Sequence, residues 1–154
     1  MAAQNWDRAI GHVLAFEGGF ADRSDPHKYP HPEYVNHGIT YGTYKHYHPE
    51  ATKETIKNLT DEQAKQFYSD TFRKEIGFDT LQSGLDVVLL HAAVMFGVHG
   101  SQTLLNDAKG DWGFLVVLMM HNKMHRGEKD WHYMQGWSDR FKAVYELARE
   151  LSIK

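Results

Sequence analysis

Apolar residues recur at helical spacing over most of the chain and predict four or five helices. The first helix is expected to begin after Asn5, a good N-cap, and to end at Gly18 and Gly19, which are typical stop residues. Its buried stripe comprises Trp6, Ile10, Val13 and Leu14. Glu17 continues this apolar stripe, so an acidic side chain is predicted to point toward the core.

Further helices are predicted over residues 60–73, 81–98 and 114–126, and from Trp131 or Trp137 to Leu151. Thr60 and Gln63 form a capping box for the first of these, and Gly110 and Gly113 are expected to flank a turn before residue 114. The positions expected to face the core are Ala64, Phe67, Tyr68, Phe72, Leu115, Leu118, Met119, Phe141, Val144, Tyr145 and Ala148. The predicted fold class is therefore mainly α.

The segment from about residue 20 to residue 48 breaks the helical pattern. Pro26, Pro30 and Pro32 forbid a continuous helix there. We expect a long irregular loop or a small β-hairpin after the first helix, with a short strand within residues 38–44. A loop of this length in a small domain is usually functional or mobile.

Composition narrows the class of protein. The 154 residues are 42% hydrophobic and 24% charged, which predicts one globular domain spanning residues 1–154. The absence of cysteine excludes disulfides, Cys-ligated zinc, iron–sulfur clusters and thiol nucleophiles. The longest apolar run, residues 85–98, is interrupted by His91 and is shorter than the ~20 residues of a membrane helix. We therefore expect no stable membrane insertion.

Histidine dominates the charge behaviour. The formal net charge is −3, and protonation of all eleven histidines would bring it to +8. The surface is thus expected to attract anionic polymers more strongly below pH ~6.5. A constitutive basic patch is absent, so we expect no nucleic-acid partner.

Glu17 is the strongest candidate for chemistry. The C-terminal end of a helix and partial burial both disfavour a negative charge, so both are expected to raise the pKa of Glu17. A carboxyl group that stays protonated near neutral pH is what a general acid in glycoside cleavage requires. The alternative without a catalytic role is that Glu17 lies at the edge of the core and its carboxyl group reaches solvent.

Glycoside hydrolysis commonly uses a second carboxylate. Asp22 and Asp25 lie close enough in sequence to share a cleft with Glu17, although aspartates in loops are often turn formers. Glu33 is a further candidate. The glycines after Glu17 allow a ligand to approach the backbone closely, and Phe20 is a candidate for stacking on a sugar ring.

Several short motifs occur together in this sequence. They are Phe-Glu-Gly-Gly-Phe at 16–20, Ser-Asp-Pro at 24–26, Asn-His-Gly-Ile-Thr at 36–40, Leu-Thr-Asp-Glu-Gln-Ala at 59–64, Ala-Ala-Val-Met-Phe-Gly at 92–97 and Gly-Trp-Ser-Asp-Arg at 136–140. In order and spacing they resemble glycoside hydrolase family 108, the phage endolysin and secretion-activator group of N-acetylmuramidases. The resemblance covers nearly the whole chain.

The resemblance implies a lysozyme-like helical fold and hydrolysis of the β-1,4 bond between N-acetylmuramic acid and N-acetylglucosamine in peptidoglycan. It implies that Glu17 is the general acid and that Asp25 and Thr40 are further catalytic residues. The substrate-binding candidates are Gly18, Gly19, Phe20 and Tyr41, and the candidate stacking platforms also include Tyr29, Tyr34 and Tyr44.

The sequence also departs from the family pattern. Residues 27–35 replace a shorter glycine-rich stretch, Val35 stands where a threonine is expected, and Met95 stands where an asparagine is usual. Arg140 is a candidate anchor for a carboxylate near the cleft, although a surface ion pair is the commoner fate of such an arginine.

Two other classes of function remain open. His121 and His125 lie four apart on a predicted helix, and His27 and His31 form a second pair, so a His-ligated metallohydrolase is one alternative. A catalytically inactive wall-binding or effector protein of the same fold is the other. For the muramidase reading we expect no cofactor, no metal and a monomer whose partner is the peptidoglycan glycan strand.

The first residues lack the basic and apolar regions of a secretory signal. We expect a phage-encoded enzyme to stay in the host cytoplasm before its release to the periplasm. The alternative is a bacterial protein exported without a recognisable signal peptide.

Overall fold

The computed structural model describes residues 2–28, 33–126 and 134–153. The described helices are η1 (Ala2–Asn5), α1 (Trp6–Phe16), α2 (Tyr41–Tyr47), α3 (Lys53–Lys57), α4 (Asp61–Asp70), α5 (Phe72–Glu75), η2 (Phe78–Thr80), α6 (Leu85–Asp107), α7 (Trp112–Arg126) and α8 (Met134–Ser152). The strands are β1 (Ala21–Arg23), β2 (Glu33–Asn36) and β3 (Ile39–Thr40). The predicted mainly α, lysozyme-like class, with a small sheet after the first helix, is confirmed.

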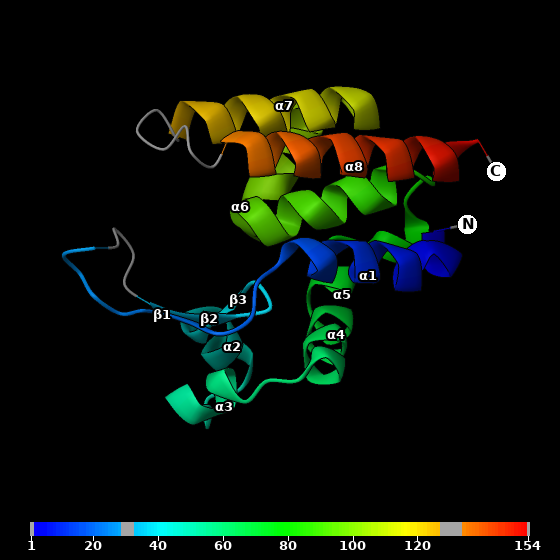
Figure 1. Cartoon of the computed structure of the whole chain (residues 1–154). Coiled ribbons are helices and arrows are strands. Elements are labelled where there is room, and N and C mark those ends of the chain that lie inside the picture. The colour runs from blue at the N-terminus through cyan, green and yellow to red at the C-terminus, as the bar shows by residue number, and fades with distance from the viewer. Residues whose placement is uncertain (1, 29–32, 127–133, 154) are drawn as a thin grey trace.

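The helices form two layers around α6. Helices α7 and α8 pack on one side of α6, and α1 and α5 pack on the other (Figure 1). The sheet lies at one end of the molecule, with α2 and α3 packed against β2. Both chain ends lie at the opposite end (Figure 1), where Arg8 of α1 forms an ion pair of 2.9 Å with Glu150 of α8.

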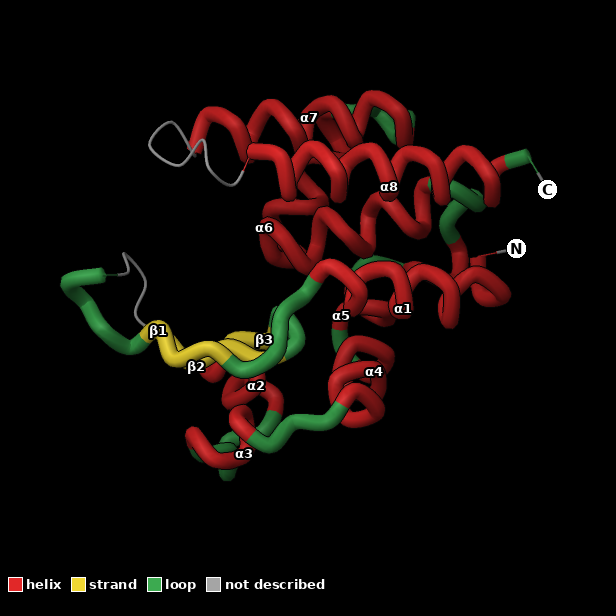
Figure 2. The backbone as a smooth tube through the Cα atoms, viewed as in Figure 1, coloured by secondary structure: helices red, strands yellow, loops and turns green. Residues whose placement is uncertain are grey.

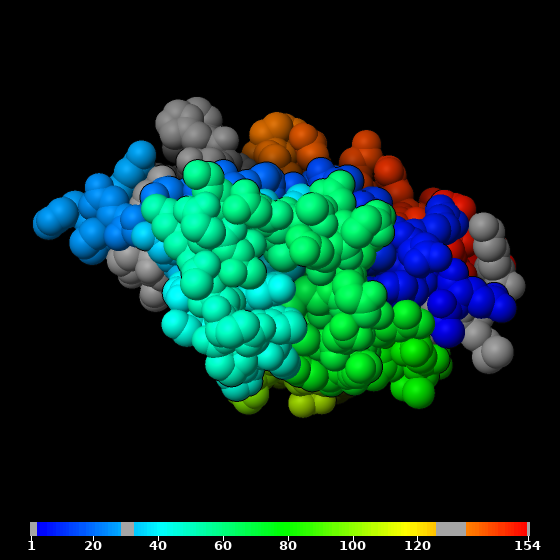
Figure 3. Space-filling model, turned by 90° about the horizontal axis from the view of Figure 1, so that it is seen from below, coloured from blue at the N-terminus to red at the C-terminus, as the bar shows by residue number. Residues whose placement is uncertain are grey.

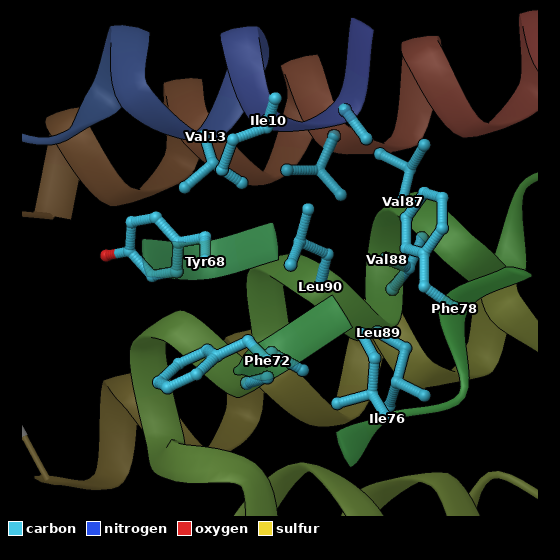
Figure 4. Close-up of a cluster of buried hydrophobic side chains, with 14 of the residues drawn as sticks. Ile10, Val13, Tyr68, Phe72, Ile76, Phe78, Val87, Val88, Leu89 and Leu90 are labelled. Atoms are coloured by element: carbon cyan, nitrogen blue, oxygen red, sulfur yellow. The ribbon is translucent and has the colours of Figure 1, made fainter. Parts of the chain in front are cut away.

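The first half of α6 is the centre of the core. Residues 85–93 are all buried, and they pack against Ile10 and Val13 of α1 and Tyr68 of α4 (Figure 4). Helix α6 is long and apolar enough by composition to cross a membrane. Its packing between α1, α5, α7 and α8 identifies it as the central helix of a folded domain.

The sheet is a small antiparallel β-structure with the order β1-β2-β3 (Figure 2). Ala21 lies opposite Val35, and Val35 lies opposite Thr40. The predicted hairpin is therefore present. The strand expected within residues 38–44 is only Ile39–Thr40, because Thr40 caps α2 with its side chain, accepting a hydrogen bond from the Thr43 amide at 3.2 Å. Residues 41–47 are thus helical, and Tyr44 packs against the core.

Helix α1 begins after Asn5 as predicted, but Asn5 does not cap it with its side chain. The side-chain amide of Asn5 instead donates to Asp86 Oδ2 at 2.7 Å and to Ser83 Oγ at 3.2 Å. Asp86 is fully buried and also accepts hydrogen bonds from the Gly84 and Val87 amides. Asn5 thus links the start of α1 to the start of α6 by hydrogen bonds and does not cap α1.

Several other boundaries differ from the predictions. The central helix starts at Leu85 rather than at residue 81, because Gly84 has a φ of 95°. It continues past residue 98 through a non-helical Gly97, with φ 78° and ψ 162°. The capping box of Thr60 and Gln63 is confirmed, but its helix ends at Asp70.

Three further predictions on helices are wrong or untested. Gly113 lies inside α7 and does not flank the preceding turn. Tyr145 is 44% exposed although it was expected on the inner face of α8. The short helix α3, with its capping box of Thr52 and Thr55, was not predicted. Trp131 lies outside the described residues.

Candidate active site

Glu17 lies where α1 ends and the chain turns toward the sheet. It is the C-cap residue of α1, and its backbone amide donates to the carbonyl of Leu14 at 3.2 Å. Its side chain is 17% exposed. The predicted location at a helix C-terminus, away from bulk water, is therefore present.

The turn after β2 lies directly against the Glu17 carboxyl group. A Cβ atom placed on Gly38 would be 2.8 Å from both Cδ and Oε2 of Glu17. Gly38 has a φ of 76°, and His37 before it has a φ of 51°. Only a residue without a side chain allows the backbone to approach the carboxyl group this closely.

Two hydrogen bonds hold this turn in place. The His37 amide donates to the carbonyl of Gly18 at 3.0 Å, and the Tyr68 hydroxyl donates to the carbonyl of His37 at 2.9 Å. The pKa of Tyr68 is raised, first by burial and then by the nearby negative charge of Glu17. Tyr68 therefore stays neutral and remains a donor throughout the physiological range.

Arg140 of α8 is the direct partner of Glu17. Its Nη1 donates to Glu17 Oε1 at 2.7 Å, and the arginine is only 9% exposed. Arg140 was predicted as a candidate anchor for a carboxylate, and the structure places it against the Glu17 carboxyl group. An arginine stabilises the ionised form of a carboxyl group, which is opposite in sign to the effects of burial and of a helix end. The protonated state expected for Glu17 stays a prediction.

A buried pair of histidines lies behind Arg140. His91 Nδ1 accepts from Arg140 Nε at 3.4 Å and from Nη2 at 3.3 Å. His91 Nε2 lies 3.0 Å from Nδ1 of His12 on α1. Burial, and then the positive charge of Arg140, lower the pKa values of both histidines, that of His91 far below its ordinary value. Both imidazoles are therefore neutral at pH 7.

This pair makes stability depend on pH. Because the folded state resists protonation of His12 and His91, the unfolded chain binds more protons below its histidine pKa of ~6.5. The stability that the neutral His12 and His91 contribute is fully present above pH ~6.5 and is lost as the pH falls. We expect the free energy of unfolding to decrease by up to ~1.4 kcal/mol per pH unit for each histidine. Urea unfolding at pH 8, 7, 6 and 5 measures the effect.

His91→Gln is the matched comparison for this measurement because it removes one of the two titrating groups. Its unfolding free energy is expected to fall less steeply than that of the wild type between pH 6.5 and pH 5. If the unfolding free energies of the two proteins fell equally steeply with pH, His91 would not contribute to the pH dependence of stability.

The structure does not bring the second-carboxylate candidates into contact with Glu17 within the residues it describes. Asp25 is exposed in a turn after β1 that projects from the body of the molecule (Figure 3), and its Oδ1 accepts from the His27 amide at 2.9 Å. Asp22 bonds to Ser24 and forms an ion pair of 3.3 Å with Lys53. Their catalytic roles stay predictions.

Glu33 has a structural partner of its own. Its Oε1 accepts a hydrogen bond from the Gly42 amide in the first turn of α2. A carboxylate is favourable at the start of a helix, because the amide groups there are otherwise unpaired. The geometry therefore gives Glu33 a capping function.

Thr40 and Gly38 lie on one side of a cavity of about 200 Å³. Tyr68 of α4, Phe72 of α5 and Val94 of α6 also line this cavity. Thr40 also donates its hydroxyl to Thr43 Oγ1 at 2.9 Å, in addition to capping α2. The threonine thus lies beside the turn that contacts Glu17.

The aromatic candidates pack mainly on each other. Phe20 stacks on Tyr34 with ring centroids 6.4 Å apart, and the Tyr34 ring also contacts that of Tyr41 at 6.2 Å. The Tyr41 hydroxyl donates to the carbonyl of Ala51 at 3.2 Å. Tyr29 lies outside the described residues, and the exposed Gly18 and Gly19 leave open space where a side chain would be.

The histidine pairs considered as metal ligands do not form a larger cluster in the part of the chain that is described. The rings of His121 and His125 lie together on α7, with centroids 4.2 Å apart. His31, the expected partner of His27, lies outside the described residues.

The contacts of His12, His91 and Tyr68 at this site were not predicted from the sequence. The available signal was His91 itself, since a titratable group in the middle of an apolar run must find a polar partner when it is buried. The identity of that partner could not be read from sequence, because Arg140 is 49 residues further along the chain.

The structure is a lysozyme-like helical fold with a largely buried glutamate at the end of its first helix. The sequence matches the glycosyl hydrolase 108 family over residues 10–97, and the chain belongs to that family. It is accordingly a glycosidase of the general peptidoglycan-hydrolase type.

The fold is similar to that of SagA from Brucella abortus. The TM-score is 0.78 at 22% sequence identity, and the match covers 99% of this chain and 98% of SagA. At this identity the likeness establishes the fold alone. No curated protein matches the sequence.

Proposed function

We propose that the protein is an N-acetylmuramidase that hydrolyses the β-1,4 bond between N-acetylmuramic acid and N-acetylglucosamine, with Glu17 as general acid. The observation that carries the proposal is the position of the Glu17 carboxyl group. It lies between the end of α1 and the turn at Gly38, with a mostly buried side chain. Family membership supplies the substrate class, peptidoglycan.

The two carboxyl oxygens of Glu17 have different surroundings. Oε1 is held by Arg140, whereas Oε2 is the oxygen that faces Gly38. We assign proton donation to Oε2. The proton passes to the glycosidic oxygen and the bond from that oxygen to the anomeric carbon breaks. A water molecule attacks the anomeric carbon and gives one of its protons to Asp25.

Asp25 and Thr40 are proposed to hold that water. Within the described part of the chain, Asp25 Oδ1 accepts from the His27 amide and Asp25 Oδ2 makes no hydrogen bond. Asp22 and Glu33, in contrast, are engaged with Lys53 and with the Gly42 amide. Asp25 therefore stays the preferred second carboxylate.

A comparison of the three carboxylates tests this choice. We expect Asp25→Asn to lower kcat about 100-fold, which is the lower range for loss of an acid–base group. Asp22→Asn and Glu33→Gln are expected to lower it less than ~5-fold, because they remove a surface ion pair and a helix cap. Release of soluble glycan from purified peptidoglycan measures the rates. A larger loss in either of the last two variants would transfer the role to that residue.

The test of the proposed function is mass spectrometry of purified peptidoglycan after digestion by the wild-type protein. New reducing ends on N-acetylmuramic acid are the expected result. Reducing ends on N-acetylglucosamine would show a glucosaminidase. Intact glycan would indicate the alternative, a wall-binding protein without catalysis, and cut peptides with intact glycan would overturn the assignment to a glycosidase.

A further inference from the structure

Glu17, Arg140, His91 and His12 form one continuous chain of polar contacts through the core. The links measure 2.7 Å from Glu17 Oε1 to Arg140 Nη1, 3.3 Å from Arg140 Nη2 to His91 Nδ1, and 3.0 Å from His91 Nε2 to His12 Nδ1. The chain joins α8, α6 and α1. His91 is fully buried, and Arg140 is 9% exposed.

Arg140 lies outside the segment matched by the family, which ends at residue 97. Among the described residues, Glu17 forms no ion pair other than that with Arg140. Arg140 is therefore the cationic partner of the Glu17 carboxyl group.

The direction of each hydrogen bond follows from chemistry. A guanidinium group only donates, so His91 Nδ1 must accept and carries no proton. The proton of a neutral His91 is then on Nε2, and it is donated to Nδ1 of His12. His12 must consequently carry its own proton on Nε2. Each member of the chain fixes the protonation of the next.

The surroundings of the pair favour its neutral form. The Phe16 ring lies over the Arg140 guanidinium at 5.8 Å and contacts the His12 ring at 5.3 Å and the His91 ring at 6.4 Å. The charged groups that act on the histidines are Arg140 and Arg8, and both act against a positive charge on His12. A protonated His91 could no longer accept from Arg140.

We propose that Arg140 is a positioning residue for the Glu17 carboxylate, and that His91 and His12 orient Arg140 by serving as neutral hydrogen-bond partners. An arginine side chain has many rotamers, and fixing its Nε edge on His91 leaves Nη1 directed at Oε1. Oε2 then faces the Gly38 turn. The same contact stabilises the carboxylate that forms as the proton leaves, an interaction that grows along the reaction. The inference rests on the proposed function of Glu17.

Variants of His91 separate orientation from simple packing. His91→Phe keeps a buried ring but offers Arg140 no acceptor, and His91→Gln restores an acceptor. Kinetics on soluble glycan chains, prepared from peptidoglycan by removing the stem peptides, are expected to show kcat reduced at least ~30-fold in His91→Phe. We expect partial recovery, to within ~5-fold of the wild type, in His91→Gln, and KM changed less than ~2-fold in both.

Arg140→Lys tests the forked geometry, because lysine can reach Glu17 or His91 with one ammonium group but cannot bridge them as a guanidinium does. A loss of kcat similar to that of His91→Phe is expected. Arg149→Lys, an exposed position on the same helix, is the matched control and should retain wild-type kcat. Rates are expressed per folded molecule, from circular dichroism and Tm. Wild-type kcat in folded His91→Phe would overturn the proposal.

A readout independent of activity distinguishes failure of this inference from failure of the proposed function. Nitrogen-15 NMR of labelled imidazoles at pH 7 should show His91 as the neutral tautomer protonated on Nε2, with its Nδ1 signal shifted in Arg140→Lys. A protonated His91, or the tautomer protonated on Nδ1, would overturn the chain even in an active enzyme. An inactive wild type with the expected spectrum would reject the function and retain the chain.

Discussion

Glu17→Gln is expected to lower the rate of glycan cleavage at least 1,000-fold while leaving the fold intact. Glutamine keeps the size of the side chain and an oxygen that can accept from Arg140, but it has no acidic proton to give. Loss of a general acid typically costs 10²- to 10⁴-fold, and burial of the side chain leaves little room for a replacement donor from bulk water. The measurement is kcat on soluble glycan, with Tm as the check on folding.

Glu146→Gln is the matched control for this variant. Glu146 is an exposed residue of α8 that forms an i,i+4 pair with Lys142 at 3.9 Å, and its variant should cleave glycan at the wild-type rate. Unchanged cell-wall lysis by Glu17→Gln would show that Glu17 is not the acid, and the wall-binding alternative would then have to be considered for any residual effect.

Gly38→Ala is expected to reduce kcat at least 100-fold by moving the carboxyl group. The added methyl group would lie 2.8 Å from Cδ and Oε2 of Glu17, a distance that forces one of the two to shift. A displacement of about 1 Å in a catalytic group is enough for a loss of this size. The positive φ of Gly38 adds about 1–2 kcal/mol of strain.

Gly110→Ala separates the strain from the displacement. Gly110 has a φ of 77°, nearly that of Gly38, but a methyl group there would meet no atom within 4 Å. Gly38→Ala should lose at least as much stability in urea unfolding as Gly110→Ala, because it adds a collision to the strain, and only Gly38→Ala should lose activity. Equal activities in the two variants would contradict the close-approach role of Gly38.

Local sequence signals predicted the elements that depend on near neighbours. The capping box of Thr60 and Gln63, the apolar stripe of α1 and the break after Glu17 all act within a few residues, and the structure contains each of them. The helix α2 was missed because Thr40 serves two elements, as the last residue of β3 and as the cap of α2. A β-branched and aromatic segment of that length favours a strand by propensity.

The candidate site was predictable only in part, for the same reason. The position of Glu17 follows from the helix that carries it, so its place at the end of α1 could be inferred from residues 6–19. Its partners come from three distant elements: Gly38 after β2, His91 in α6 and Arg140 in α8. Such contacts depend on tertiary packing. They leave no pattern of residue spacing in a single sequence from which they could be predicted.

The location of the chain ends has a practical consequence. Residues near both ends are tied together by Arg8 and Glu150, at the end of the molecule opposite the sheet (Figure 1). A tether, a solid support or a fused targeting module joined to either terminus would therefore sit remote from the carboxyl group and the sheet. An enzyme immobilised through a terminus would still expose the end that carries Glu17 and the sheet. An insoluble polymer, which cannot diffuse around the enzyme, would therefore still reach this end.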